Sequence, residues 1–184
     1  MVTRNAPAFM EVAMLIFDLE TDGLLKDVSK VHCLAIYNTD EEQMHVFNDQ
    51  GNTDPIIRGI TYLEEADSIA GHNIINYDIP VIKKLYPFFE PKGNKVDTLV
   101  LSRLYHPNML DIDKKKNWPH MPLNLYGRHS LESYGYRLGE YKGSFAKTTD
   151  WKEWSQEMED YCVQDVNVTT KLCNHFRPYL TGSR

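Results

Sequence analysis

The chain has 184 residues, of which 42% are hydrophobic and 25% charged, as in a folded globular domain rather than a disordered or collagen-like chain. It carries 20 Lys and Arg against 26 Asp and Glu, a net charge of −6. This balance excludes a basic nucleic-acid coat protein but not an enzyme that holds metal with acidic residues. No apolar run approaches the ~18 residues of a membrane span. Three cysteines without metal-ligand spacing suit a reducing cytoplasm, where they would be small core residues.

Residues 1–12 are expected to form a flexible N-terminal leader, and residues 13–184 a single domain. Short apolar runs predict four strands, the first of them central and buried, at 14–17, 31–37, 44–47 and 68–72. The second and third strands are joined by five polar residues, which indicates an antiparallel pair. Helical spacing predicts helices at 56–66, from near 78 to 89, at 98–105, at 130–134 and at 155–179.

The remaining stretches are predicted to be irregular. Residues 106–129 are rich in Pro, Asn, Asp and Lys and are interpreted as a long excursion, and 135–150 as a loop. The last helix is expected to end near Pro178. In this predicted order, strands come first and are followed mostly by helices, with one later strand. Such an order indicates an α/β or α+β fold.

Two carboxylates stand at the end of the first predicted strand, in the segment FDLETDGL. Because side chains alternate faces along a strand, Asp18 and Glu20 point the same way. Like charges on one face repel unless a cation lies between them, and ions such as Mg²⁺ are held by a few carboxylates. A strand end that runs into a solvated turn, with Asp22 and Gly23 as turn residues, explains the same pattern without metal.

Two further segments carry candidate site residues. Asp78 ends the segment GHNIINYD and directly precedes a predicted helix, where an N-cap role is the alternative. Tyr161 and Asp165 lie four residues apart in the last helix and therefore on one face. An amphipathic helix with Tyr161 at its boundary and Asp165 in water explains that spacing equally well. Each segment is weak evidence when taken alone.

Together, the ordered set Asp-x-Glu, Asn-x3-Tyr-Asp and Tyr-x3-Asp resembles the three motifs of the 3′–5′ exonucleases of the DEDD superfamily. In the histidine subclass a His stands five residues before the last Asp. Here that residue is Asp160, so the tyrosine subclass fits. The resemblance is closest to the proofreading exonuclease domain of T-odd-type phage family-A DNA polymerases, and it runs from Met14 to about Leu172. Matching stretches outside the motifs include TLVLSRL, SLE and GYRLGE.

This resemblance implies an α/β fold of the RNase H-like type, a mixed β-sheet flanked by helices. It also implies two Mg²⁺ ions, with Mn²⁺ as a substitute, that clamp the attacking and leaving oxygens. Asp18 would bridge both ions, and Asp78 would support the second ion. Glu20 and Asp165 would bind the ion that carries the attacking water. Tyr161 has a reference pKa of about 10, so it would orient this water with Glu20 rather than act as a base.

Four residues resemble positions near the terminal nucleotide in similar enzymes. Leu24 matches an apolar side chain that wedges against the terminal base, with core packing as the alternative. Asn73 is a better candidate for a substrate contact than His72, for which a satisfied loop histidine is the alternative. Thr21, next to Glu20 in the first motif, completes the predicted substrate-binding set.

A phosphate track formed by basic residues is a further hypothesis. A solvated charge run, partly cancelled by Asp111 and Asp113, is the more ordinary interpretation of the lysine cluster. The candidate members are Lys114, Lys115, Lys116, Arg103, Arg128, Arg137 and Lys142.

The resemblance implies a metal-dependent 3′–5′ exodeoxyribonuclease that releases nucleoside 5′-monophosphates from single-stranded DNA or frayed DNA 3′ ends. We expect a free-standing, phage-like enzyme in the cytoplasm of a bacterial or phage-infected cell, with an excised domain as the alternative. Its expected role is DNA processing, or proofreading for a separately encoded DNA polymerase. An RNA-trimming exonuclease is the alternative, because no residue in the sequence can be identified as a contact for the 2′-OH that distinguishes RNA from DNA. A catalytically silent nucleic-acid-binding module is disfavoured because all four carboxylates and the tyrosine are present.

Overall fold

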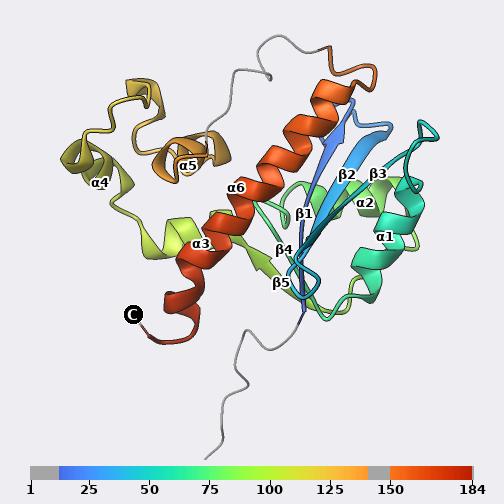
Figure 1. Cartoon of the computed structure of the whole chain (residues 1–184), viewed down its shortest axis with the longest axis horizontal. Helices are drawn as coiled ribbons and strands as arrows, with labels where there is room; N and C mark the ends of the chain where they lie inside the picture. The colour runs from blue at the N-terminus through green and yellow to red at the C-terminus, as the bar shows by residue number, and fades with distance from the viewer. Residues whose placement is uncertain (1–12, 141–149, 184) are drawn as a thin grey trace, which may run out of the picture.

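The computed structural model describes residues 13–140 and 150–183. The expected leader at 1–12 and the candidate Lys142 lie outside these residues, so both stay predictions. The centre of the fold is a mixed sheet of five strands in the order β3-β2-β1-β4-β5 (Figure 1).

Three strands form an antiparallel meander, and two more extend the sheet in parallel beyond β1. The strands are β1 (Met14–Thr21), β2 (Val31–Asn38), β3 (Gln43–Asn48), β4 (Ser68–Gly71) and β5 (Asn94–Asp97). The meander and β4 are confirmed predictions. β1 continues past Phe17 through the acidic segment. β5 was not predicted, because the sequence NKVD contains no apolar run.

Six helices and a short 3-10 turn complete the described part of the chain. They are α1 (Ile56–Glu65), α2 (Asp78–Leu85), α3 (Thr98–Tyr105), α4 (Met109–Lys116), the turn Leu123–Leu125, α5 (Leu131–Arg137) and α6 (Gln156–Leu180). The predicted irregular excursion at 106–129 is wrong, because α4 and the 3-10 turn lie inside it. α2 is shorter than predicted, α5 continues through Gly135, and α6 tolerates Pro178 in its last turn.

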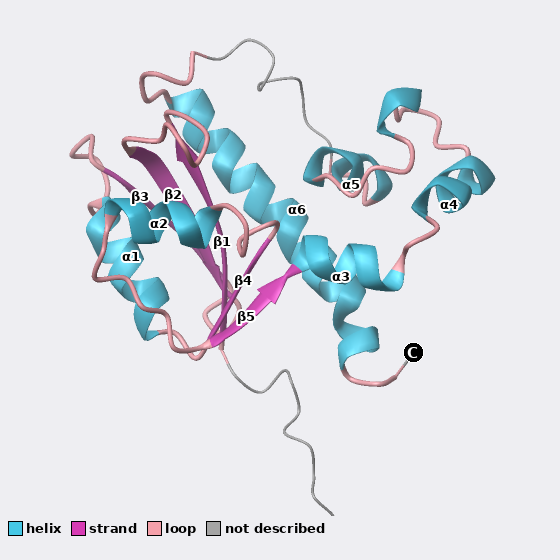
Figure 2. Cartoon of the chain, turned by 180° about the vertical axis from the view of Figure 1, so that it is seen from behind, coloured by secondary structure: helices cyan, strands magenta, loops and turns pink. Residues whose placement is uncertain are grey.

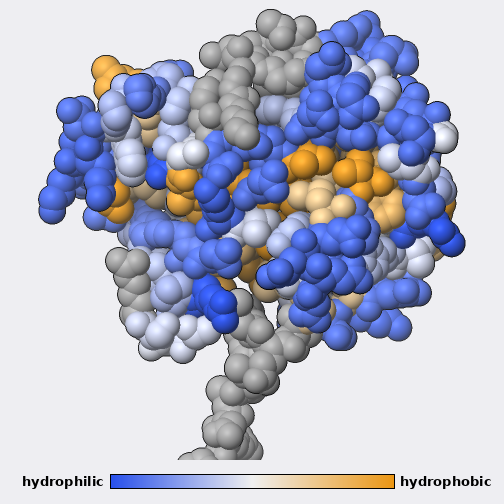
Figure 3. Space-filling view, in the orientation of Figure 1, coloured by the Kyte–Doolittle hydropathy of each residue, from blue (hydrophilic) through white to orange (hydrophobic). Residues whose placement is uncertain are grey.

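Alternation along β1 gives the sheet two different cores. Odd-numbered side chains such as Phe17 pack with α1 and α2 on one face, whereas Ile16 packs with Cys162 and Val166 of α6 on the other. Figure 2 shows α1 and α2 on the side of the sheet opposite α6. Figure 3 shows a hydrophobic surface patch next to α6, over the part of the sheet that this helix leaves uncovered.

A lateral group of helices, α3, α4 and α5, lies beside α6 and away from the meander (Figure 1). Its apolar side chains pack on the C-terminal half of α6, through Met109, Tyr134, Val168, Leu172 and Phe176. Among the described residues, no helix is both long and apolar enough to cross a membrane.

Candidate metal centre

The end of β1 presents two carboxylates to α6. Asp18 and Glu20 follow Ile16 in steps of two, so they point to the face that α6 covers, as the strand alternation predicted. Ligand atoms of Asp18, Glu20 and Cys162 all lie within 4.8 Å of one another. A register shift between Glu20 and Thr21 ends the regular pairing with β2 at this point.

Two other elements bring a carboxylate each to the same place. Asp165 of α6 interacts electrostatically with Asp18 and Glu20, and Asp78 of α2 does so with the same two residues. Asp78 is the first residue of α2, whose N-cap is Tyr77, so the N-cap interpretation of Asp78 is wrong. The structure therefore collects Asp18, Glu20, Asp78 and Asp165 from three segments that are far apart in sequence.

Burial makes these negative charges costly. Glu20 and Asp78 are 8% and 3% exposed. Burial, followed by repulsion from Asp165, raises the pKa of Asp18 well above its ordinary value. For Glu20 the causes of its raised pKa are burial and then the charges of Asp18 and Asp165. The pKa of Asp78 is raised by burial and Asp18, and burial raises the pKa of Asp165 to about 7.

Within residues 13–140 and 150–183, no lysine or arginine forms an ion pair that balances this charge. None of the ion pairs found in the described part of the chain includes Asp18, Glu20, Asp78 or Asp165. Among the same residues, the Glu20 carboxylate also has no hydrogen-bond donor. A buried charge without a partner is expensive, so a cation from solution fits this place. Four carboxylates as oxygen donors suit a hard divalent ion such as Mg²⁺.

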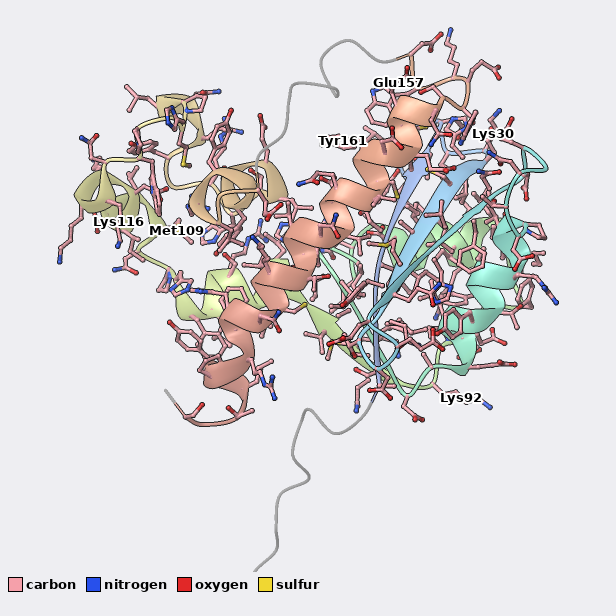
Figure 4. The ribbon with its side chains drawn as sticks, viewed as in Figure 1. Lys30, Lys92, Met109, Lys116, Glu157 and Tyr161 are labelled. Atoms are coloured by element: carbon pink, nitrogen blue, oxygen red, sulfur yellow. The ribbon has the colours of Figure 1, made fainter. Side chains whose placement is uncertain are left out.

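Tyr161 lies on α6, one turn before Asp165. Figure 4 shows it in the N-terminal part of the helix, on the side that faces α5. Burial, Asp165 and Glu20 all raise the pKa of its phenol. The group therefore stays protonated at neutral pH and can donate a hydrogen bond, which agrees with an orienting role and not with a base.

Leu24 and Thr21 occupy the turn after β1. The Leu24 side chain is 76% exposed, so the core-packing alternative for it is wrong. The Thr21 hydroxyl lies 2.6 Å from the Tyr77 hydroxyl and donates to the Gly23 carbonyl at 2.9 Å. Tyr77 donates to that same carbonyl at 2.7 Å. These contacts fix the backbone that carries Leu24 beside the carboxylates, and a substrate contact by Thr21 stays a prediction.

Asn73 and His72 lie in the loop that follows β4. Asn73 adopts a left-handed φ of 67°, which Asn tolerates better than most residues, and its side chain is half-buried. His72 Nδ1 lies 2.8 Å from the Thr98 hydroxyl, and burial lowers the pKa of this imidazole to about 4. His72 thus has the partner that the alternative interpretation required. Contact of either residue with substrate stays a prediction.

The phosphate-track hypothesis is wrong for Arg137 and stays a prediction for the exposed Lys114, Lys115 and Lys116. Arg137 is buried in an ion pair with Asp113, in which its Nη2 lies 2.7 Å from Oδ2. Figure 4 shows Lys116 at the outer end of α4, far from Tyr161. Arg103 and Arg128 are exposed and stay candidates.

The sequence interpretation missed two residues of the centre. Cys162 is a core residue, as predicted, and its thiol also donates to the Asp18 carbonyl at 3.3 Å. Asp97 caps α3 and also accepts from the backbone N–H groups of Asn73 and Ile75, at 2.9 and 3.1 Å. An Asp directly before the helical TLVLSRL stretch was the signal for the cap. No local signal indicated the contact of Cys162.

A mixed sheet whose central strand carries two carboxylates beneath a crossing helix is the architecture of RNase H-like nucleases. The chain belongs to the RNase H superfamily, whose sequence pattern matches residues 15–177. The predicted fold class, an RNase H-like mixed sheet flanked by helices, is thereby confirmed.

Known proteins resemble this chain in sequence or in fold. The DNA-directed DNA polymerase of Enterobacteria phage T3 is 34% identical over 182 residues, which cover 86% of this chain and 26% of the polymerase. The chain thus spans about a quarter of the length of that relative. E. coli ExoI in complex with single-stranded DNA has a TM-score of 0.59 at 17% identity, over 94% of this chain and 42% of ExoI. Brucella melitensis NrnC with bound Mg²⁺ has a TM-score of 0.59 at 19% identity, over 94% and 76%.

Proposed function

We propose that this protein is a metal-dependent 3′–5′ exonuclease that removes nucleoside 5′-monophosphates from the 3′ ends of single-stranded or frayed DNA. The observation that carries the proposal is the convergence of four buried or half-buried carboxylates, from β1, α2 and α6, with which no lysine or arginine of the described residues forms an ion pair. DNA as substrate is supported by the phage relative, a DNA polymerase, and by the ExoI complex with single-stranded DNA.

Asp18, Glu20, Asp78 and Asp165 are the residues that would hold two Mg²⁺ ions, with Mn²⁺ as a substitute. The Mg²⁺ in the NrnC structure supports this assignment. When bound, such ions stabilise the charge on the attacking and leaving oxygens of an in-line displacement at phosphorus. Without them the four carboxylates repel the phosphates of DNA, so activity requires the metal.

The side chains around the carboxylates would orient the reactants. The protonated Tyr161 phenol donates a hydrogen bond to the attacking water, and Glu20 accepts one from it, so the water is aimed at phosphorus. The exposed Leu24 side chain packs against the terminal base, which every nucleotide offers, and this explains tolerance of sequence. Asn73, whose side chain is half-buried at the edge of the same site, would hydrogen-bond the terminal nucleotide.

The biological partner proposed for this enzyme is a DNA polymerase. Likeness to a quarter of a phage DNA polymerase supports proofreading, in which the exonuclease removes a mispaired 3′ nucleotide before synthesis continues. A frayed end suits the site because a mispaired nucleotide leaves the duplex more readily than a paired one.

Digestion of a 5′-labelled single-stranded DNA oligonucleotide tests the proposal. With Mg²⁺ we expect a descending ladder that starts at the full-length strand, and no ladder with chelator. Asp165→Asn should slow the reaction by about 100-fold or more, as expected when a metal ligand is removed. Asp160→Asn is the matched control, because Asp160 is an exposed acid on the same helix.

Three outcomes would contradict the proposal: a ladder that chelator leaves unchanged, mononucleotides released from the 5′ end, or equal rates in Asp165→Asn and the wild type. A matched RNA strand decides the substrate class. Digestion of RNA in preference to DNA would replace the proposal by the RNA-trimming alternative.

A further inference from the structure

A sulfur atom lies among the carboxylates of the candidate metal centre. Cys162 of α6 is 1% exposed, and its thiol donates to the Asp18 backbone carbonyl at 3.3 Å. The same sulfur is 3.8 Å from Asp18 Oδ2. Sulfur and the ligand oxygens of Asp18 and Glu20 all lie within 4.8 Å of one another. Oxygen and sulfur ligand atoms from three residues therefore lie together at this centre.

The second observation is the state of Glu20. Its carboxylate is nine-tenths buried, and among the described residues it has neither a hydrogen-bond donor nor a cation. It lies with Asp18 and Cys162, so a positive charge placed between the three side chains removes the repulsion between the two carboxylates.

The donor set discriminates between classes of metal ion. Mg²⁺ takes oxygen ligands, whereas Zn²⁺ and similar ions take thiolates together with carboxylates. Bonds of about 2.3 Å to sulfur and about 2.0–2.2 Å to oxygen place neighbouring ligand atoms of a tetrahedral ion about 3.5 Å apart. The three ligand atoms lie within 4.8 Å of one another, with Sγ 3.8 Å from Asp18 Oδ2, so the side chains must draw closer together when an ion binds.

We propose that Cys162 provides a sulfur ligand at this centre, so that a thiophilic divalent ion, Zn²⁺ or Cd²⁺, binds through Asp18, Glu20 and Cys162. On binding, the thiol releases its proton to solvent and the thiolate donates an electron pair to the ion, with no change of oxidation state. The bound ion takes two of the carboxylates that the proposed reaction assigns to Mg²⁺, and it therefore inhibits the exonuclease. Only this inhibition rests on the proposed function.

The other two cysteines provide the controls. Cys173 lies on the same helix but lines a separate cavity with Met14 and Tyr37. Cys33 of β2 lies opposite Glu20 and contacts the Cys162 thiol, so it is the competing sulfur. Replacing each cysteine in turn identifies the sulfur that binds.

The test is a titration of the metal-free protein with CdCl2, followed by the ultraviolet sulfur-to-cadmium charge-transfer band. We expect the band in the wild type, Cys173→Ala and Cys33→Ala, and its loss in Cys162→Ala with at least about tenfold weaker Cd²⁺ binding. If Cys162→Ala does not fold, Glu20→Gln serves instead, because it keeps every thiol and removes a repelling charge. It should weaken Cd²⁺ binding by about tenfold as well.

A wild type without the band, or a band that survives Cys162→Ala, would overturn the sulfur ligand. If Glu20→Gln binds Cd²⁺ as tightly as the wild type, Glu20 is not a ligand of the ion that Cys162 binds, and the proposed three-residue site is overturned. The digestion assay with Mg²⁺ separates the two proposals. A ladder with Mg²⁺ and no cadmium band rejects the sulfur ligand alone, whereas a cadmium band without a ladder rejects the exonuclease alone and supports the sulfur ligand.

Discussion

Individual side chains at the centre differ in what their surroundings allow them to do. The half-buried carboxylates of Asp18 and Asp165 repel each other, and the Tyr161 phenol is close enough to both to interact with their charges. Negative neighbours keep a phenol protonated, so Tyr161 can position a reactant but cannot remove a proton from it at neutral pH. The residue is therefore a positioning group, and its removal should affect the rate more than the binding of metal or DNA.

Tyr161→Phe tests this role. Because it deletes one hydrogen-bond donor and keeps the ring, we expect kcat to fall by about 10- to 100-fold with little change in KM or in metal affinity. Single-turnover digestion at saturating Mg²⁺ measures the effect, and Tyr126→Phe, remote from the carboxylates, is the control. A loss of metal affinity that matches the loss of rate would contradict an orienting role.

Leu24 is exposed beside the site and should contribute through the substrate alone. Leu24→Ala should leave the free energy of unfolding within about 0.5 kcal/mol of the wild type. It should raise KM for single-stranded DNA by about three- to tenfold, because one modest apolar contact with the substrate is lost. Leu123→Ala is matched to it, because Leu123 is 80% exposed on the 3-10 turn. Equal effects of the two substitutions would exclude a wedge at Leu24.

At the scale of elements, one buried ion pair ties α4 to α5. Asp113 accepts from Arg137 Nε and Nη2 at 2.9 and 2.7 Å, and also from the Trp118 indole and the Gly127 amide. These four donors lower the pKa of Asp113 despite its burial. The pair therefore stabilises the fold above the ordinary pKa of an aspartate, and this contribution is lost as pH falls through the lowered value.

Arg137→Leu should destabilise the protein by about 3–5 kcal/mol at pH 7, because it leaves a buried carboxylate without its cation. The double variant Asp113→Leu with Arg137→Leu should recover part of that loss, since it removes the stranded charge. Urea unfolding of the single and double variants measures both effects. An equal or larger loss in the double variant would mean that packing of the arginine stem, rather than the charge pair, joins the helices.

At the scale of the whole molecule, the carboxylates of the metal centre lower the stability of the metal-free protein at neutral pH. The raised pKa values of its carboxylates mean that the folded state disfavours their charged forms. Without metal, stability is therefore greatest below the ordinary carboxyl pKa of about 4, as far as these groups contribute. It falls as pH rises through the raised values, which for Asp165 is about 7. A bound cation reverses this loss.

Asp165→Asn should accordingly stabilise the metal-free protein while it abolishes activity. We expect a gain on the order of 1–3 kcal/mol at pH 8 and almost none at pH 4, because the removed carboxylate is charged only at the higher pH. Thermal unfolding with chelator at both pH values measures the difference from the wild type. Asp160→Asn should show no such pH-dependent gain. A stability difference that is the same at both pH values would contradict the linkage.

Local pattern placed pairs of candidate site residues on one face, whereas the whole set was predicted from the family resemblance. Strand alternation placed Asp18 and Glu20 on one face, and the helical repeat did the same for Tyr161 and Asp165, because both periodicities are properties of the backbone. The antiparallel meander followed from short runs joined by a polar turn. β5 and α4 escaped prediction, since their segments carry too few apolar residues for either periodicity to show.

Contacts between distant segments depend on the folded chain. Only the sheet order brings α2 to the end of β1, and only the path of α6 across the sheet brings Asp165 and the Cys162 thiol to Asp18. No periodicity in the sequence encodes such a distance, and the burial that raises the carboxyl pKa values arises from packing of all these elements together. The exposure of Leu24 also depends on the folded chain. An apolar side chain in the turn after a strand is buried or exposed according to whether another element packs over that turn.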